Sequence, residues 1–289
     1  MSGTAVSRTG VSDRTSLALL LVPGLLALGA TFVLPMIWLA RASFSTSSLQ
    51  AFGGGWTWEH YVEAIFDPFY WKVALNTLNL GLTVSFGAVI LGFPIALFLT
   101  RTTSRWRGVL TALAVAPLLT SAVVRTYGWM VILGDRGVIN GTLQALSLIE
   151  KPFRLSNNLL GANIALIEIL MPYAILAMLS GFGRLNHQLE EAASMLGANR
   201  FKVFTRIILP LSLPGVLTAL LLVFVLAISS FVTPRLMGGG RVFVLGTEVF
   251  SEATVTLNWP LAAALAMVLL VLFSTVIVLY QRALKSLEF

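Results

Sequence analysis

The 289-residue chain carries 11% charged and 57% hydrophobic residues, whereas soluble domains carry about 25% charged residues. With a mean hydropathy of +0.89, it has too few polar groups to cover its own apolar surface, so much of it must face lipid. The formal net charge of +7 comes from short basic clusters between apolar runs, as in membrane proteins, which argues against a nucleic-acid partner. The absence of cysteine excludes disulfides, thiolate nucleophiles and cysteine-ligated metals.

The first apolar run covers residues 17–40 and contains 24 uncharged positions. At ~1.5 Å per residue this run reaches about 36 Å, which is enough to span a bilayer with some tilt. It is too long for a cleaved signal peptide and lacks a small-residue exit. We therefore expect an uncleaved first span, preceded by a polar cytoplasmic tail over residues 1–15.

Five further runs are long and apolar enough to cross a membrane. They cover residues 73–100, about 108–133, about 159–180, about 213–233 and about 260–281. Backbone groups in lipid must be satisfied within their own segment, so each run is expected to be helical. The pattern predicts an all-α integral membrane protein with six transmembrane helices in one domain over residues 16–289.

The distribution of Lys and Arg predicts the orientation of these spans. If the N-terminus is inside, the inner segments are the tail, residues 101–107, residues 181–211 and the C-terminus, and together they hold 11 of the 19 basic residues. The turn 101–107, RTTSRWR, is the strongest single indication. The bias of Lys and Arg toward cytoplasmic segments then places both termini in the cytoplasm.

Residues 190–212, EEAASMLGANRFKVFTRIILPLS, form a charged, small-residue segment within this apolar chain. Glu190 and Glu191 suit the positive end of a helix, and Gly197 suits a left-handed helix stop. Asn199 can cap a second short helix, which Pro210 is expected to close. The pattern predicts a helix–turn–helix outside the membrane, and an ordinary amphipathic connecting loop is the alternative.

The stretch EAASMLGANRFKVFTRIILP resembles the EAA motif of ABC importer permeases, EAA-x3-G-x9-I-x-L-P. The matching positions are Glu191, Ala192, Ala193, Gly197, Ile207, Leu209 and Pro210. The resemblance implies a type I ABC importer permease fold with a core over about 73–281, in the inner membrane of a bacterial cell. It also implies that residues 184–211, including Glu190, form the coupling segment that seats on an ATPase subunit.

The same resemblance implies the partners of the chain. These are two ATPase subunits, a second homologous permease subunit or a second copy of this chain, and an external solute-binding protein. None of the four lysines lies in a G-x4-G-K-[ST] context, and no G-x-S-x-G or H-E-x-x-H occurs. We therefore expect no enzymatic activity and no cofactor in this chain, with ATP and Mg²⁺ bound by the partner ATPase.

Three other stretches are similar to the spermidine and putrescine branch of that family. They are APLLTSAVVRTYGWMVILGDRGVIN, SSFVTPRLMGGG and NWPLAAALAMVLL. Sister branches share versions of these stretches, so another small organic solute or an anion is the alternative to a polyamine. A stand-alone secondary transporter is the alternative from another class, but it would need internal repeats and midplane ion sites, and no clear repeat is evident.

Two ionisable residues, Arg125 in the third predicted span and Glu168 in the fourth, lie at bilayer depth. A charge there costs at least ~2.5–3.5 kcal/mol unless it is paired or faces water. Arg125 either snorkels to the outer interface or has a structural or gating role. Glu168 is either a structural partner of Arg125 or a carboxylate on the translocation path, with Ser229, Ser230 and Thr233 on the opposite wall.

Overall fold

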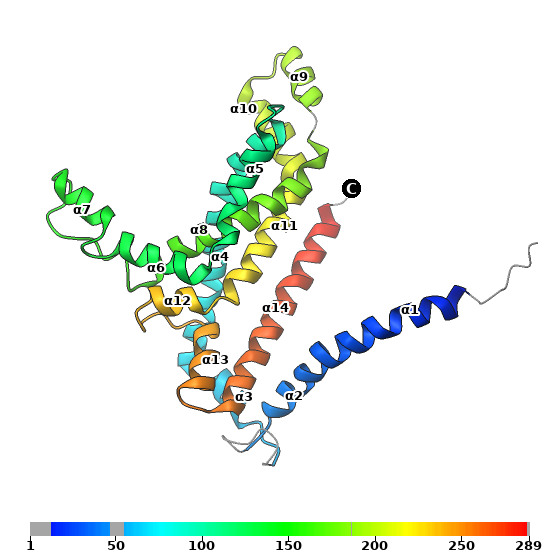
Figure 1. Ribbon diagram of the computed structural model, residues 1–289, viewed down its shortest axis with the longest axis vertical. Helices are drawn as coiled ribbons and strands as arrows, with labels where there is room; N and C mark the ends of the chain where they lie inside the picture. The colour runs from blue at the N-terminus through cyan, green and yellow to red at the C-terminus, as the bar shows by residue number, and fades with distance from the viewer. Residues whose placement is uncertain (1–12, 47–54, 186, 288–289) are drawn as a thin grey trace, which may run out of the picture.

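The computed structural model describes residues 13–46, 55–185 and 187–287, so most of the predicted tail lies outside the described residues. Within these ranges the chain is built of helices, as predicted (Figure 1). Five helices are long and apolar enough to cross a membrane, and a bent pair of helices supplies a sixth crossing if it is counted as one span. The all-helical class and the span count therefore agree with the prediction from apolar run length.

The first span leaves the body of the molecule. It consists of α1 (Asp13–Leu28), a π-helical turn (Gly29–Val33) and α2 (Leu34–Ala42). Only α2 reaches the other long helices, where it packs on α14 (Trp259–Leu287), and α1 extends away from them (Figure 1). None of its most apolar window is buried within the chain, so lipid or another subunit must cover it.

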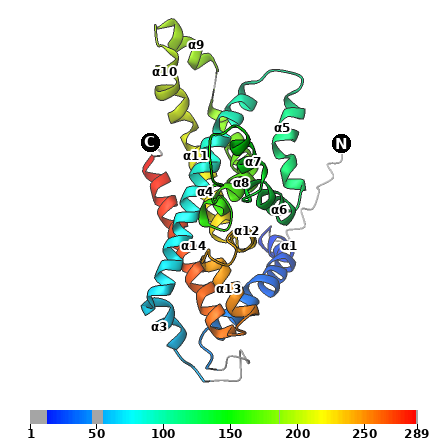
Figure 2. The ribbon, with the colours of Figure 1, turned by 90° about the vertical axis from the view of Figure 1, so that its left-hand side faces the viewer.

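Three helices form the centre of the molecule: α4 (Pro68–Arg101), α8 (Leu159–Gly181) and α11 (Leu209–Ile228). They pack on one another pairwise (Figure 2). Their shared core is aliphatic and rich in alanine, and it includes Leu80, Val84, Ala88, Leu166, Leu170, Ala174, Ala219, Val223 and Ala227. Small residues let helix backbones approach closely where lipid offers no hydrophobic driving force between helices.

The backbones of α8 and α11 come close together at two glycines. A Cβ atom added at Gly181 would collide with the Cα atom of Gly215, and one added at Gly215 would lie 3.1 Å from the Cα of Gly181. Gly181 has no room for a side chain and the space at Gly215 is tight, so the two helices touch there through their backbones.

The third predicted span is not one straight helix. It consists of α5 (Arg107–Val115), a 3-10 turn (Ala116–Leu119) and α6 (Ala122–Leu133), which α7 (Val138–Ala145) follows. The two halves are bent by 90°. Pro117 lies in the 3-10 turn, and the extended residues Thr120 and Ser121 (ψ 138° and 132°) separate the halves. The expectation of one helix over 108–133 was wrong because Pro117 ends the regular hydrogen bonding there.

The fifth span begins earlier than predicted, and Pro210 does not close a helix. α10 (Arg200–Val203), a π-helical turn (Phe204–Ile208) and α11 form one continuous helix. A proline ring normally clashes with the carbonyl four residues earlier, and the wide π turn before Pro210 relieves that clash. This helix ends at Ile228, after which α12 (Val232–Met237) begins.

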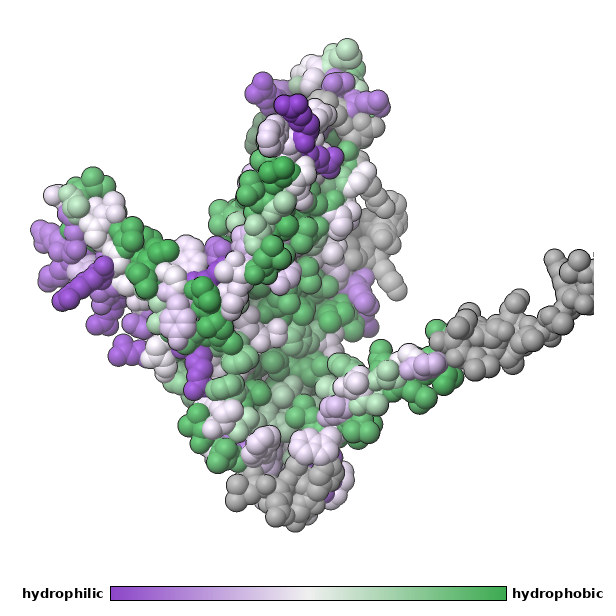
Figure 3. Space-filling model, in the orientation of Figure 1, coloured by the Kyte–Doolittle hydropathy of each residue, from purple (hydrophilic) through white to green (hydrophobic). Residues whose placement is uncertain are grey.

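Shorter helices occupy the two ends of the molecule. α9 (His187–Met195) lies with α10 at one end, and α3 (Glu59–Phe66) lies with α13 (Leu245–Thr254) at the other (Figure 1). Hydrophilic side chains gather over the α9–α10 end and around α7, while hydrophobic side chains cover the flanks of the long helices between them (Figure 3). This distribution suits a protein whose middle is immersed in lipid.

Candidate functional site

The segment with the EAA pattern folds as a helix, a tight turn and a second helix. Gly197 has a φ of +83°, and the N–H of Ala198 donates to the carbonyl of Ala193 at 3.0 Å. These features make the left-handed helix stop that the sequence predicts. The Asn199 side chain accepts a hydrogen bond from the N–H of Lys202 at 2.9 Å, so the predicted helix cap is also confirmed.

This turn exposes an apolar tip. Met195 is 91% exposed, Leu196 is 89% exposed and Phe201 is 73% exposed. Ala192 on α9 is also exposed, and Ala193 is half-buried. Large apolar side chains gathered on one protrusion are typical of a surface that a partner covers.

The other side of the segment packs on the body. Val203 and Ile208 are buried, and the ring of Phe204 lies edge-on to that of Phe93 on α4. Ile207 is half-buried, whereas Leu209 and Pro210, at the start of α11, are exposed in the isolated chain. The segment therefore has one face fixed to the long helices and one free tip.

An ion pair ties α9 to the end of α4. Arg101 Nη2 lies 2.5 Å from Glu190 Oε1, and the Glu190 side chain is 14% exposed. Both residues line a 710 Å³ groove whose walls also include Glu191 and Arg200. The sequence analysis placed Arg101 in an inner turn but did not predict this contact.

Four of the five predicted path residues meet at one cavity. Arg125, Ser229, Ser230 and Thr233 line a 410 Å³ cavity between α6, α8 and the break after α11. Other residues on its walls were not predicted, and they include Thr120, Tyr173 and Phe231. Thr120 lies at the break in the third span, and its position there was a signal, because an interrupted helix at membrane depth usually lines a cavity.

The hydroxyl hydrogens of the three predicted hydroxyl residues, Ser229, Ser230 and Thr233, are already used. Ser229 donates to the carbonyls of Val225 and Leu226, and Ser230 donates to the carbonyl of Leu226 at 2.8 Å. The Thr233 hydroxyl is hydrogen-bonded to that of Thr126 at 2.9 Å. A hydroxyl keeps its lone pairs after it donates, so Ser229 and Ser230 act as acceptors toward anything in the cavity.

The fifth predicted residue, Glu168, does not line the cavity but pairs with a residue that does. Arg125 Nη1 lies 3.4 Å from Glu168 Oε1, and Trp129 Nε1 donates to Glu168 Oε2 at 3.1 Å. The Arg125 side chain is 13% exposed and that of Glu168 is 31% exposed. Two alternatives were considered for Glu168, and in the structure it pairs with Arg125. This pairing lowers the free-energy cost of placing both charges at bilayer depth.

Within the described ranges, no group of three His, Asp or Glu side chains is arranged to hold a metal ion.

Comparisons with known proteins match almost the whole chain. A family model described as "Binding-protein-dependent transport system inner membrane component" matches residues 88–286. The spermidine/putrescine transport system permease protein PotB of Haemophilus influenzae is 33% identical over 268 residues, which cover 93% of this chain and 90% of that protein.

Solved structures show the same fold. A bacterial ABC transporter involved in the import of the acidic polysaccharide alginate matches with a TM-score of 0.75 at 19% identity, covering 96% of this chain and 98% of that chain. A bacterial alginate ABC transporter in complex with its pentasaccharide-bound periplasmic protein matches with a TM-score of 0.71 at 19% identity, covering 95% and 96%. The chain therefore belongs to the family of binding-protein-dependent transport system inner membrane components and is an ABC importer permease.

Proposed function

We propose that this permease moves spermidine, putrescine or a related small amine into the cell by alternating access. The single observation that carries the choice of solute is the similarity to PotB, which extends over 93% of the chain at 33% identity. Membership of the importer family argues against the alternative of a stand-alone secondary transporter.

The partners are those that an importer of this kind requires. Two ATPase subunits bind and hydrolyse ATP with Mg²⁺, a second permease subunit or a second copy of this chain completes the path, and an external binding protein delivers the solute. Both termini of the chain lie in the cytoplasm, as the basic residues indicate. On this orientation the α9–α10 end faces the ATPase.

Residues 184–211 form the coupling segment. Support comes from the exposed apolar tip of Met195, Leu196 and Phe201 and from the fixed opposite face. Such a tip can seat in a groove of the ATPase and follow its movement. Glu190 and Glu191 stand beside that tip on α9, with Ala192 and Ala193 allowing close approach.

The translocation path runs through the 410 Å³ cavity. Ser229 and Ser230 offer hydrogen-bond acceptors there, which suits an ammonium group that can only donate. Thr233 and Arg125 line the wall, and Glu168 outside the cavity pairs with Arg125. A weak polar lining favours passage, because tight binding would slow release of the solute.

An anionic solute is the second candidate, and one observation favours it. Among the described residues that line the cavity, Arg125 alone is charged, and a guanidinium group attracts carboxylates. Glu168 partly neutralises this charge, which makes the anion the weaker candidate.

Uptake by the reconstituted importer tests the proposal. Proteoliposomes that contain the permease, its ATPase and its binding protein should accumulate labelled spermidine or putrescine when ATP is enclosed, and a catalytically dead ATPase should abolish this. Accumulation of an organic anion that polyamines do not compete with would instead establish the second candidate.

A further inference from the structure

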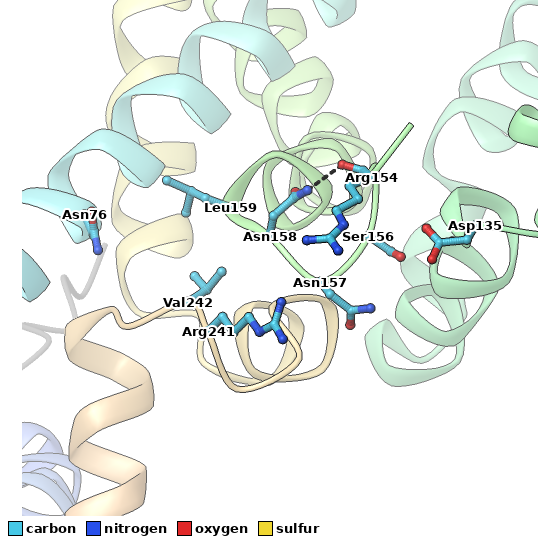
Figure 4. A pocket seen from close by; sticks show the side chains of 9 residues that line it. All are labelled: Asn76, Asp135, Arg154, Ser156, Asn157, Asn158, Leu159, Arg241 and Val242. Carbon is cyan, nitrogen blue, oxygen red and sulfur yellow. Dashed lines mark hydrogen bonds between the residues drawn. The ribbon is translucent and has the colours of Figure 1, made fainter. Parts of the chain in front are cut away.

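A polar pocket lies apart from both the coupling segment and the path cavity. It has a volume of 480 Å³ and is lined by Asn76, Asp135, Arg154, Ser156, Asn157 and Arg241, among others. Arg154 comes from the connection between α7 and α8, and Arg241 from the connection between α12 and α13. Figure 4 shows both guanidinium groups pointing into the same space, with Asp135 on the far side.

The backbone holds these two connections tightly together. Asn157 and Gly239 both have left-handed conformations, with φ of +58° and +54°. A Cβ atom at Gly239 would lie 2.5 Å from Asn157 Oδ1, so a larger residue would have to displace the Asn157 side chain, and the positive φ also favours glycine. Asn158 also anchors the Arg154 backbone, donating from Nδ2 to its carbonyl at 2.6 Å (Figure 4). The fold therefore brings two arginines to one mouth on a fixed backbone.

The charge of the pocket is unbalanced. Within the described part of the chain, neither Arg154 nor Arg241 has a carboxylate within 4.0 Å. The N-terminus of α8, a helix of 23 residues, begins at the same pocket and adds a partial positive charge. Asp135 contributes one negative charge against these. Guanidinium groups that converge repel each other, and a carboxylate between them would relieve the repulsion and accept paired hydrogen bonds from them.

We propose that this pocket receives a carboxylate side chain of the external solute-binding protein. The inference rests on the proposed partner and orientation, which place the α7–α8 and α12–α13 connections on the outer face. A protein side chain fits better than the solute, because two arginines repel a polyamine. The pocket thus supplies charge complementarity for docking, separate from the path that the solute follows.

Titration of binding-protein-stimulated ATP hydrolysis tests this docking site. The assembled importer in proteoliposomes is titrated with solute-loaded binding protein, and the half-maximal concentration is measured. Arg154→Glu and Arg241→Glu should each raise that concentration by about tenfold or more, because each places a like charge against the incoming carboxylate. The maximal rate should be retained. Arg136→Glu is the matched control, since Arg136 is exposed nearby but does not line the pocket, and it should change the value less than twofold.

Further variants test the pocket with milder changes, in case the Glu variants do not fold, and identify the partner residue on the binding protein. Arg154→Gln and Arg241→Gln remove the charge without reversing it and should give smaller shifts in the same direction, with a reduced dependence on salt. An Asp or Glu of the binding protein changed to Lys should restore tight docking to the Arg154→Glu or Arg241→Glu importer.

Three results would overturn the proposal. They are an unchanged half-maximal concentration in all pocket variants, an equal shift in the Arg136→Glu control, or a raised KM for solute with normal docking, which would make the pocket a solute site. If the wild-type importer responds to the binding protein but takes up no polyamine, the proposed solute is wrong while the docking test stays valid.

Discussion

The guanidinium of Arg101, the last residue of α4, lies 2.5 Å from the carboxylate of Glu190 on α9, a residue 89 positions later in the chain. α4 is one of the three central helices, and α9 carries the apolar tip. The pair is therefore a direct link from the proposed ATPase contact to the core. It lies at the edge of the body, where water weakens it, but it is short and connects α9 to the end of α4.

Reversal of one charge in this pair should weaken coupling. We expect Arg101→Glu to reduce binding-protein-stimulated ATP hydrolysis severalfold, because two carboxylates would push α9 away from α4. The double variant Arg101→Glu with Glu190→Arg should recover most of the rate. Arg105→Glu, which reverses an exposed charge in the same turn, is the control. Failure of the double variant to recover would show that the pair does not transmit movement.

The left-handed stop at Gly197 should be needed for coupling rather than for insertion. A side chain at φ +83° costs about 1–2 kcal/mol, and Gly197→Val would turn the apolar tip away from its partner. We expect normal membrane insertion, loss of ATPase co-purification and loss of stimulated hydrolysis. Gly183→Ala is the control, since Gly183 has open space around it and no positive φ.

Glu191→Arg should likewise lower stimulated hydrolysis, because it places the wrong charge beside the tip. Normal coupling in both Gly197→Val and Glu191→Arg would refute the assignment of this segment to coupling.

Thiol labelling can establish the orientation. The chain has no cysteine, so single cysteines report without background. With the termini inside, Ser104→Cys should be protected from an impermeant reagent added outside intact cells, whereas Glu150→Cys should react. Both positions are exposed. The opposite pattern would put the EAA segment on the outer face and remove its role in coupling.

Neutralisation of Glu168 should affect both stability and transport. Glu168→Gln leaves Arg125 buried without its counter-ion, and removing one partner of a fully buried pair costs 3–5 kcal/mol. Glu168 is 31% exposed, so we expect about 1–2 kcal/mol, visible as a lower melting temperature of the complex.

We also expect slower polyamine uptake by the Glu168→Gln importer. The double variant with Arg125→Gln should regain stability, because no unpaired charge remains. A normal melting temperature together with normal uptake in Glu168→Gln would exclude both the structural and the path role.

Close packing at Gly181 should tolerate no side chain. Gly181→Ala would force α8 away from α11, because the new Cβ would collide with the Gly215 backbone. Overpacking of this kind typically costs about 1–3 kcal/mol. Gly128→Ala, on α6 with open space around it, should be neutral or slightly stabilising. Thermal unfolding of the two variants in detergent compares them, and equal stabilities would contradict the direct contact.

The elements that the sequence predicted well are those fixed by local chemistry. The spans follow from the length of each apolar run against the thickness of the bilayer. The stop at Gly197 and the cap at Asn199 follow from backbone and side-chain geometry within a few residues. The errors arose at prolines: Pro117 breaks a span that composition alone makes continuous, whereas Pro210 is absorbed into a helix by a π turn.

Most contacts between distant segments were beyond the reach of one sequence, and the pairing of Arg125 with Glu168 was only one of two alternatives. Arg101 was visible only as one of several inner arginines, since nothing local relates it to Glu190. Arg125 and Glu168 were recognised because charge at bilayer depth is costly, but their pairing with Trp129 required the packing of α6 on α8. Arg154 and Arg241 carried no local signal at all. Their convergence depends on two connections that meet only in the folded chain.

The continuous helix from Arg200 to Ile228 connects the coupling segment to the edge of the path cavity. Its 29 residues span about 43 Å at ~1.5 Å per residue. Gly215, where it touches α8, lies near its midpoint, about 22 Å from the end beside the apolar tip and about 20 Å from the end at the cavity. At that point α11 meets α8 through glycine backbone, whereas the rest of their contact is made by side chains. A tilt of this helix about Gly215 would move its two ends in opposite directions by similar distances. A displacement of the end beside the apolar tip would therefore be accompanied by an opposite displacement of similar size at the cavity.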